Sequence, residues 1–371
     1  MPKLEVLSSG PRTTVQDLGF RGGRAQGVPQ GGVLDRDSLF LLNALLGNPE
    51  GTAALEMALL PPRLRAVDGP VRVATGGNLT GRVQPPGDAE ARPLGPWTAT
   101  TLAPGDTLLL DPPQGGGTAL LGVAGGVALP TILGSHSTFL RAGFGGFEGR
   151  VLRKGDMLPV PEAAGDAEDD ITFDAPPATG AADDPIRVVP GPQDDQFTAQ
   201  GMACFLDASF TVTPLSDRMG MRLEGPALEH LPDLGADIVS DGVAPGAIQV
   251  PGNGQPIVLL ADAQTTGGYA KIATVISADL SRLARLVPGN TLRFAAVTLP
   301  EAEALAREHR NRLDAIAAQC VPVSSGSPGH PDLRALYEAN LISGTVDTRR
   351  ADHFPGHLEA RGQATGENGC S

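Results

Sequence analysis

The chain has 371 residues, a formal net charge of −14, 49 glycines and 34 prolines, and a hydrophobic fraction of 41%. This length favours two domains, and the glycine and proline content favours many short strands joined by tight turns. The acidic balance excludes a nucleic-acid-binding role, because no basic stripe is available to meet phosphates.

Further exclusions concern the membrane and the redox compartment. Residues 112–140 carry no charge, but six glycines between 115 and 126 make this segment too weakly apolar to span a membrane. Three widely separated cysteines and an N-terminus without a signal-peptide core indicate a cytoplasmic protein. We therefore expect a mainly β protein with short helices, of the α+β class.

The first elements follow clear periodicities. Alternating patterns predict strands at 4–8, 63–67 and 71–75. Between them, residues 34–49 show an apolar stripe at helical spacing that ends in Gly-Asn-Pro, so we expect a helix there. Asp35 precedes the stripe and is the expected N-cap.

A turn sequence recurs three times along the chain, at 104–108, 154–158 and 288–292. Each copy has a Gly-Asp or Gly-Asn pair followed by an apolar strand, which is typical of hairpins. The unequal spacing excludes a solenoid repeat and favours barrels built from similar hairpins.

An acidic segment divides the chain. Residues 161–185 contain eight acidic residues and no basic one, which predicts a mobile linker or loop. This gives four parts: an N-terminal β-rich barrel domain at 1–160, the linker at 161–185, a C-terminal barrel domain at 186–322, and a mobile tail at 323–371.

Three short helices are expected in the second domain, around 194–204, at 277–286 with Ser277 as N-cap, and at 301–318. The last has a stripe of apolar residues that also includes His309. We interpret His309 as a residue of the helix face, not as a metal ligand.

Single-motif catalysis is absent from the sequence. There is no phosphate-binding loop, no dinucleotide fingerprint, no nucleophile elbow and no cysteine pair with zinc spacing. Ser135-His136-Ser137 places serine beside histidine, but neighbours on a strand point to opposite faces, so we expect no catalytic dyad. No metal site is predicted.

Three glycine-rich segments carry clustered polar residues, at 15–35, 216–225 and 248–271. Such glycines serve either tight turns or the close approach of backbone to a ligand, and three clusters together favour a ligand site. The last contains Lys271, one of only three lysines beside 25 arginines.

Within these segments the chain resembles a known family. The strings SDRMGMRLEG at 216–225, GAIQVPGNGQPIVLLAD at 246–262 and TTGGYAKIATVI at 265–276 are similar to the family of allophanate hydrolase subunit 2, KipA and the C subunit of 5-oxoprolinase. Shorter strings, including VQDLG at 15–19 and GGFEGR at 145–150, extend the resemblance across residues 4–299.

The resemblance implies tandem cyclophilin-like β-barrel domains in a protein that works only with partners. In the 5-oxoprolinase form, these are a KipI-like B subunit and an A subunit, and the complex opens 5-oxo-L-proline to L-glutamate with ATP and Mg²⁺. ATP would be bound mainly by the partner. Two alternatives are the carboxyltransferase component of a biotin-dependent urea or allophanate carboxylase, and a non-enzymatic regulator that binds a KipI-like protein. Biotin would be attached to another chain, because no Met-Lys-Met signal is present.

For the lactam-opening reaction, the resembling segments offer residues for each role. The catalytic candidates are the ammonium of Lys271 and the carboxylates of Asp217 and Asp262. Either carboxylate would act as a base or as a Mg²⁺ ligand. The substrate-binding candidates are Arg21, Arg218, Gln249, Asn253, Gln264, Thr266 and Tyr269. Tyr269 and Lys271 are two apart, so a continuous strand would place them on the same face.

The sequence departs from the family pattern at four places. Phe20 and His136 stand where the pattern has arginine, Gly31 stands where it has serine, and Ala270 stands where it has proline. The changes at Phe20, Gly31 and His136 concern the N-terminal cluster, so the role of that cluster is left open.

Overall fold

The computed structural model describes residues 1–323 except 88, 162–168, 176 and 178–183. The predicted mobile tail and most of the predicted linker therefore lie outside the described residues. The described chain is mainly β with few helices, as predicted. Within it, no helix is long and apolar enough to cross a membrane.

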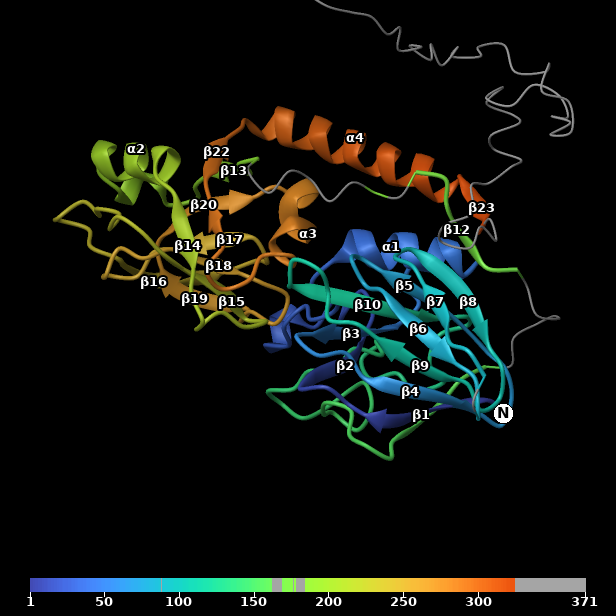
Figure 1. Ribbon diagram of the computed structural model, residues 1–371. Coiled ribbons are helices and arrows are strands. Elements are labelled where there is room, and N and C mark those ends of the chain that lie inside the picture. Colours follow the sequence, from blue (N-terminus) through green and yellow to red (C-terminus); the bar gives the residue numbers. More distant parts are fainter. Residues whose placement is uncertain (88, 162–168, 176, 178–183, 324–371) are drawn as a thin grey trace, which may run out of the picture. The chain divides into compact units, whose positions relative to one another are not determined.

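The first half of the chain folds into two packed sheets (Figure 1). One has the order β11(Met157–Pro159), β1(Lys3–Ser8), β4(Arg63–Val67), β9(Thr107–Leu110), β6(Gly81–Gln84) and β7(Arg92–Leu94). The other has the order β2(Arg12–Gln16), β3(Ala54–Ala58), β10(Thr118–Val123), β5(Val71–Gly76), β8(Thr98–Leu102), β12(Ile171–Phe173) and β23(Cys320–Pro322).

Side chains alternate between the two faces of the second sheet, so each face of this sheet packs into a separate hydrophobic core. On β10, Leu121 packs between the two sheets, whereas its neighbour Leu120 packs on the opposite face, against helix α1(Arg36–Leu45). A strand buried on both faces reads as a continuous apolar run, which explains the sequence TALLGV. Asp35 caps α1 as predicted, accepting a hydrogen bond from the Ser38 N–H at 3.0 Å.

The second half forms a sheet that closes nearly into a barrel. Its order is β21(Thr291–Leu292), β14(Phe210–Val212), β15(Gly220–Glu224), β18(Ile257–Leu259), β17(Ala247–Gln249), β20(Lys271–Val275), β13(Ile186–Pro190) and β22(Phe294–Ala296). A separate two-stranded sheet pairs β16(Asp237–Gly242) with β19(Thr266–Tyr269). The barrel core includes Phe205 of helix α2(Ala199–Asp207) and Leu283 of helix α3(Leu280–Leu283).

The remaining helices refine the sequence predictions. Three short 3₁₀ segments are η1(Arg24–Gln26), η2(Asp194–Gln196) and η3(Ser277–Asp279). Ser277 is not an N-cap, because it is the first residue of η3, whose N-cap is Ile276, and the N-cap of α3 is Asp279. The long helix α4(Leu299–Ala317) begins at a capping box formed by Thr298 and Glu301.

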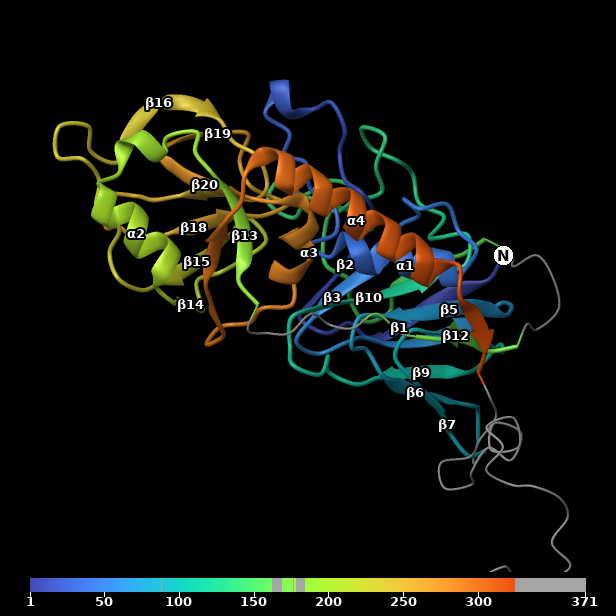
Figure 2. The same ribbon diagram turned by 90° about the horizontal axis from the view of Figure 1, so that it is seen from above.

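Helix α4 lies across α1 and leads back to the first half of the chain (Figure 2). His309 lies on the face of α4 that meets α1, with Nε2 2.9 Å from Asp37, as expected for a helix-face residue. Beyond α4, β23 pairs with β12 in the second sheet. The expectation of a loop throughout 161–185 is therefore wrong at β12, and the chain returns to the N-terminal half at 320–322.

The three predicted hairpin turns share one construction. Gly105, Gly155 and Gly289 all have φ between 91° and 95°, where glycine alone is unstrained. In each turn, the following Asp or Asn side chain accepts the backbone N–H three residues before it, at 2.7–2.9 Å. The strands β9, β11 and β21 follow these turns, which confirms the recurring turn. The expected hairpins are wrong, because β9 pairs with β4 and β6, β11 with β1, and β21 with β14, and none of them pairs with the strand that precedes it in the chain.

We predict that Asp106→Ala, which removes the buried acceptor of the first turn, costs about 1–3 kcal/mol of unfolding free energy because the Ala103 N–H loses its charged partner. Asp106→Asn keeps an acceptor, as Asn290 does naturally, and should lose less than about half of that. Urea unfolding of both variants tests this. Equal losses would show that the side-chain acceptor does not stabilise the turn.

Candidate functional site

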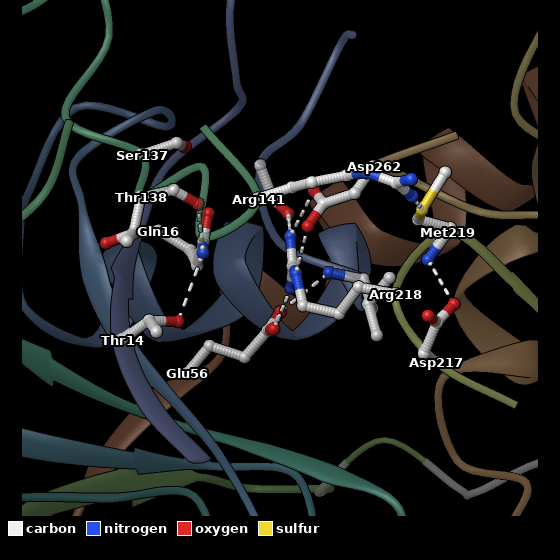
Figure 3. Close-up of polar contacts among 12 residues, drawn as sticks. Thr14, Gln16, Glu56, Ser137, Thr138, Arg141, Asp217, Arg218, Met219 and Asp262 are labelled. Atoms are coloured by element: carbon white, nitrogen blue, oxygen red, sulfur yellow. Dashed lines mark hydrogen bonds and ion pairs between the residues drawn. The ribbon is translucent and has the colours of Figure 1, made fainter. Parts of the chain in front are cut away.

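Arg218 lies between strands β14 and β15 and joins segments from both halves of the chain (Figure 3). Its Nε donates to Asp262 Oδ2 at 2.9 Å and its Nη2 to Asp262 Oδ1 at 3.0 Å. Toward the first half of the chain, its Nη1 contacts Glu56 Oε1, and its Nη2 donates to the carbonyl of Gly32 at 2.5 Å. The planar guanidinium of Arg218 thus contacts two carboxylates and one carbonyl oxygen at the same time.

Burial and ion pairing act in opposite directions on the pKa values of this cluster. Burial alone would lower the pKa of the Arg218 guanidinium, but Glu56 and Asp262 together raise it above its usual value. For Glu56, burial raises the pKa and the neighbouring Arg218 works against that rise. The second oxygen of Glu56 accepts the Leu34 N–H at 2.7 Å, so the carboxylate also fixes the segment that precedes α1.

Another buried carboxylate, that of Asp17, organises the segment around 135–137. Its oxygens accept hydrogen bonds from the hydroxyls of Ser135 and Ser137, each at 2.6 Å, and from the backbone N–H of His136 at 2.7 Å. A fourth bond comes from the Gly19 N–H at 2.7 Å. Both serines are committed to Asp17, which agrees with the prediction that they form no dyad with His136.

The departures from the family pattern are coupled in space. A Cβ on Gly31 would come within 3.1 Å of the Phe20 ring, so the small residue at 31 makes room for the large one at 20. The Phe20 ring is buried and lies 5.2 Å from the Phe144 ring centroid. Apolar packing therefore occupies this position of the N-terminal cluster. His136 contributes its backbone N–H there, and its Nδ1 has no partner among the described residues.

Gln16 and Arg141 add polar contacts beside the Arg218 cluster (Figure 3). The Gln16 amide donates to the Thr138 carbonyl at 3.0 Å and to the Thr14 hydroxyl at 3.1 Å, while its Oε1 has no partner within the part of the chain that the structure describes. Arg141 reaches across to the sulfur of Met219, in the segment that also carries Arg218.

Lys271 is the centre of a separate cluster. Its ammonium lies 3.2 Å from Asp241 Oδ2, and its own side chain is only 3% exposed whereas that of Asp241 is 57% exposed. The ammonium holds the pKa of Asp241 below its usual range, chiefly through this hydrogen bond. Gln249 is the cross-strand neighbour of Lys271, and Gln193 Oε1 accepts the Lys271 backbone N–H at 3.2 Å.

Gln249 has an unusual environment within this cluster. Its Oε1 accepts from Gln264 Nε2 at 3.4 Å, but its buried Nε2 has no partner among the described residues. A Cβ on Gly267 would lie 2.4 Å from that nitrogen, so glycine at 267 permits the amide to sit there. An unpaired buried donor is costly unless a ligand accepts from it.

The structure divides the predicted site residues into separate places. Arg218 and Asp262 form one cluster, and Lys271, Gln249 and Gln264 form another. The other predicted residues lie elsewhere. Asp217 accepts hydrogen bonds from the N–H groups of Met219 and Gly220 in a turn, and Asn253 accepts one from the Gln255 N–H. Thr266 and Tyr269 are exposed on β19, and Arg21 lines a hollow beside α1.

The expected common face of Tyr269 and Lys271 is wrong. Tyr269 ends β19 and is 41% exposed, whereas Lys271 begins β20 and is buried. The chain passes from one sheet to another at Ala270, so alternation does not continue through it.

Sequence reasoning missed Glu56, Asp241 and Gln193. Glu56 carried a signal, because a carboxylate inside the apolar strand ALEMA requires a buried cation. Asp241 and Gln193 lie in segments without local motifs, and only tertiary contacts bring them to Lys271.

The family of the chain is shown by its similarity to known proteins. Residues 26–296 match the family described as carboxyltransferase domain, subdomain A and B. The chain belongs to this carboxyltransferase family. It is 37% identical to the C subunit of 5-oxoprolinase from Escherichia coli over 305 residues, covering 81% of this chain and 93% of that protein. The corresponding Haemophilus influenzae protein is 36% identical, with 84% and 97% covered.

Larger carboxylases contain a similar region. A putative urea carboxylase of Emericella nidulans is 30% identical over 366 residues, covering 92% of this chain but 28% of that protein. The crystal structure of Kluyveromyces lactis urea carboxylase matches with a TM-score of 0.75 and 26% identity, covering 89% of this chain and 32% of that one. The resemblance found in the sequence is thus confirmed, with homology to both branches.

We predict that Arg218→Met destabilises the chain by about 3–5 kcal/mol, because it leaves the buried carboxylates of Glu56 and Asp262 without their cation. The matched control is Arg222→Met on β15, whose exposed side chain makes no ion pair among the described residues and whose loss should change stability by less than about 0.5 kcal/mol. Urea unfolding measures both. Similar values for the two variants would contradict a stabilising role of the Arg218 cluster.

Proposed function

We propose that this chain is the C subunit of an ATP-dependent 5-oxoprolinase, which opens 5-oxo-L-proline to L-glutamate together with a KipI-like B subunit and an A subunit. The supporting observation is the extent of the match. The chain aligns with 93% and 97% of two 5-oxoprolinase C subunits, but with only 28% of the urea carboxylase of Emericella nidulans.

The Lys271 cluster has the groups that a lactam requires. 5-Oxoproline carries a ring N–H donor, a carbonyl acceptor and a carboxylate. The unpartnered Nε2 of Gln249 is a donor for the carbonyl, and the ammonium of Lys271 can face the carboxylate or charge that develops on the lactam oxygen. Gln264, bonded to Gln249, holds that amide in position. We therefore assign the substrate contact on this chain to Lys271, Gln249 and Gln264.

Nucleotide and metal are assigned mainly to the partner proteins. Among the described residues, no group of three His, Cys, Asp or Glu side chains could hold a metal ion. The Asp262 carboxylate is bonded to Arg218, and that of Asp217 is bonded to two backbone N–H groups. Because both carboxylates already accept hydrogen bonds, we assign neither of them the role of base or Mg²⁺ ligand that the sequence suggested.

A second candidate is the carboxyltransferase component of a biotin-dependent carboxylase. The structural match to Kluyveromyces lactis urea carboxylase over 89% of this chain favours it. The ureido group of biotin is a cyclic amide-like group, and the same Gln249 and Lys271 contacts would suit it. A different chain would have to carry the biotin, because this one lacks the Met-Lys-Met signal.

The decisive experiment is an ATPase assay on the complex purified after co-expression with the candidate A and B subunits. We expect ATP hydrolysis that depends on 5-oxoproline, with glutamate formed in step. Biotin-dependent carboxylation in place of this activity would favour the second candidate. Failure of the three chains to co-purify would contradict the proposed assembly.

We predict that Lys271→Met lowers the turnover of that complex about 10²-fold, the scale of one lost charge-stabilising contact. Methionine keeps much of the buried side-chain volume, so this variant should fold. Lys271→Arg should rescue only part of the activity, because a planar fork replaces a point charge.

The control is Lys154→Met. Lys154 is one of the other two lysines and is exposed in the Gly-Asp turn at 154–158. It should keep wild-type turnover. Unchanged turnover in Lys271→Met, with the complex intact, would remove Lys271 from the reaction without deciding which reaction the complex performs.

A further inference from the structure

A hollow of about 380 Å³ lies beside the start of helix α1, and none of the residues assigned to the substrate lines it. Its lining comes from the segment before α1, from α1 itself and from the turn that follows it: Leu18, Arg21, Gln30, Arg36, Phe40 and Glu50. None of these residues belongs to the Arg218 or Lys271 cluster. Two of the six are arginines, and a third, Gln30, has a side-chain amide.

The carboxylates near this hollow are already paired. Glu50 accepts both Nη atoms of Arg310, at 3.0 and 3.3 Å. On the first turn of α1, Asp37 is bonded to His309 at 2.9 Å. Asp35 is bonded to Arg285 Nε at 3.0 Å and also caps the helix. Each acidic group therefore has its own partner from the second half of the chain, which is an arginine for Glu50 and Asp35 and an imidazole for Asp37.

Arg21 and Arg36 are left without such a partner. Neither guanidinium makes an ion pair or hydrogen bond among the described residues. Both side chains line the same hollow. Burial lowers the pKa of Arg36, and the positive charge of Arg21 lowers it further. Arg36 is half-buried and Arg21 is exposed, and Glu50, the carboxylate of the same lining, is paired with Arg310 and not with either of them. A bound anion would relieve the repulsion between these two cations.

We propose that this hollow binds a small organic oxyanion, held by Arg21 and Arg36. The Gln30 amide can donate a further hydrogen bond, and guanidinium forks suit carboxylate and phosphate groups alike. Leu18 and Phe40 give the hollow an apolar wall for the carbon skeleton of the ligand. Its volume is that of a small-molecule site. This anion site is independent of the proposed lactam-opening reaction.

Isothermal titration of the full chain tests the site, in a low-salt buffer free of phosphate and carboxylate. The probes are succinate and inorganic phosphate, neither of which contains a lactam. We expect at least one to bind with one-to-one stoichiometry. Arg36→Gln and Arg21→Gln should each weaken that binding at least tenfold. Lys271→Met should not affect it, which separates this site from the proposed substrate site.

The matched control is Arg24→Gln, in the same segment but outside the lining. It should bind the probe as the wild type does. Succinate binding alone identifies a carboxylate site and phosphate binding alone a phosphate site; both support the proposal. No binding of either probe at millimolar concentration, or equal binding by Arg36→Gln, would overturn it.

A second measurement excludes a merely structural role for these arginines. Without anion, Arg36→Gln removes repulsion and should unfold at the same temperature as the wild type or higher. With the probe present, the wild type should gain more thermal stability than the variant. A marked loss of stability in the anion-free variant would show that Arg36 supports the fold, and would contradict the proposal.

Discussion

The contact of Arg218 with Glu56 and Asp262 is the constraint on which the arrangement of both halves of the chain depends. A buried guanidinium tolerates little error, because each of its partners is costly to leave unpaired. The contact therefore fixes β3, which carries Glu56, relative to the loop after β18, which carries Asp262. The Gly32 carbonyl and Leu34 N–H bring the start of α1 into the same arrangement.

Two further polar clusters differ in how completely their hydrogen bonds are made. Asp17 accepts from four donors, which suits a structural role. The Lys271 cluster, in contrast, keeps an unsatisfied donor on Gln249 next to a buried ammonium. Buried polar groups of the second kind are expected where a ligand completes the set. Gln16 Oε1 and His136 Nδ1 are also buried without a partner among the described residues, but of these three groups Gln249 Nε2 is the one on the strand neighbour of a buried lysine.

Local sequence signals predicted local structure well, including the Asp35 cap and the three Gly-Asp or Gly-Asn turns, because their causes lie within a few residues. The site was predicted only in part. Lys271, Gln249 and Gln264 lie together because β17 and β20 are neighbours in the barrel. Tyr269 was misplaced because a change of sheet at Ala270 leaves no mark in the alternation of side chains. Asp241 and Glu56 come from distant segments, and no single-sequence pattern links them to their cations.

The pairing of β12 with β23 has a consequence for the order of folding. β12 ends at residue 173, and its partner strand begins only at residue 320, after the whole barrel of the second half. During synthesis, the outer edge of β12 therefore stays unpaired while about 150 further residues emerge, and such long-range strand pairing slows folding. In the full chain, β23 replaces β12 as the last strand of this sheet, so a nascent or truncated chain without β23 leaves the edge of β12 free to pair with other chains.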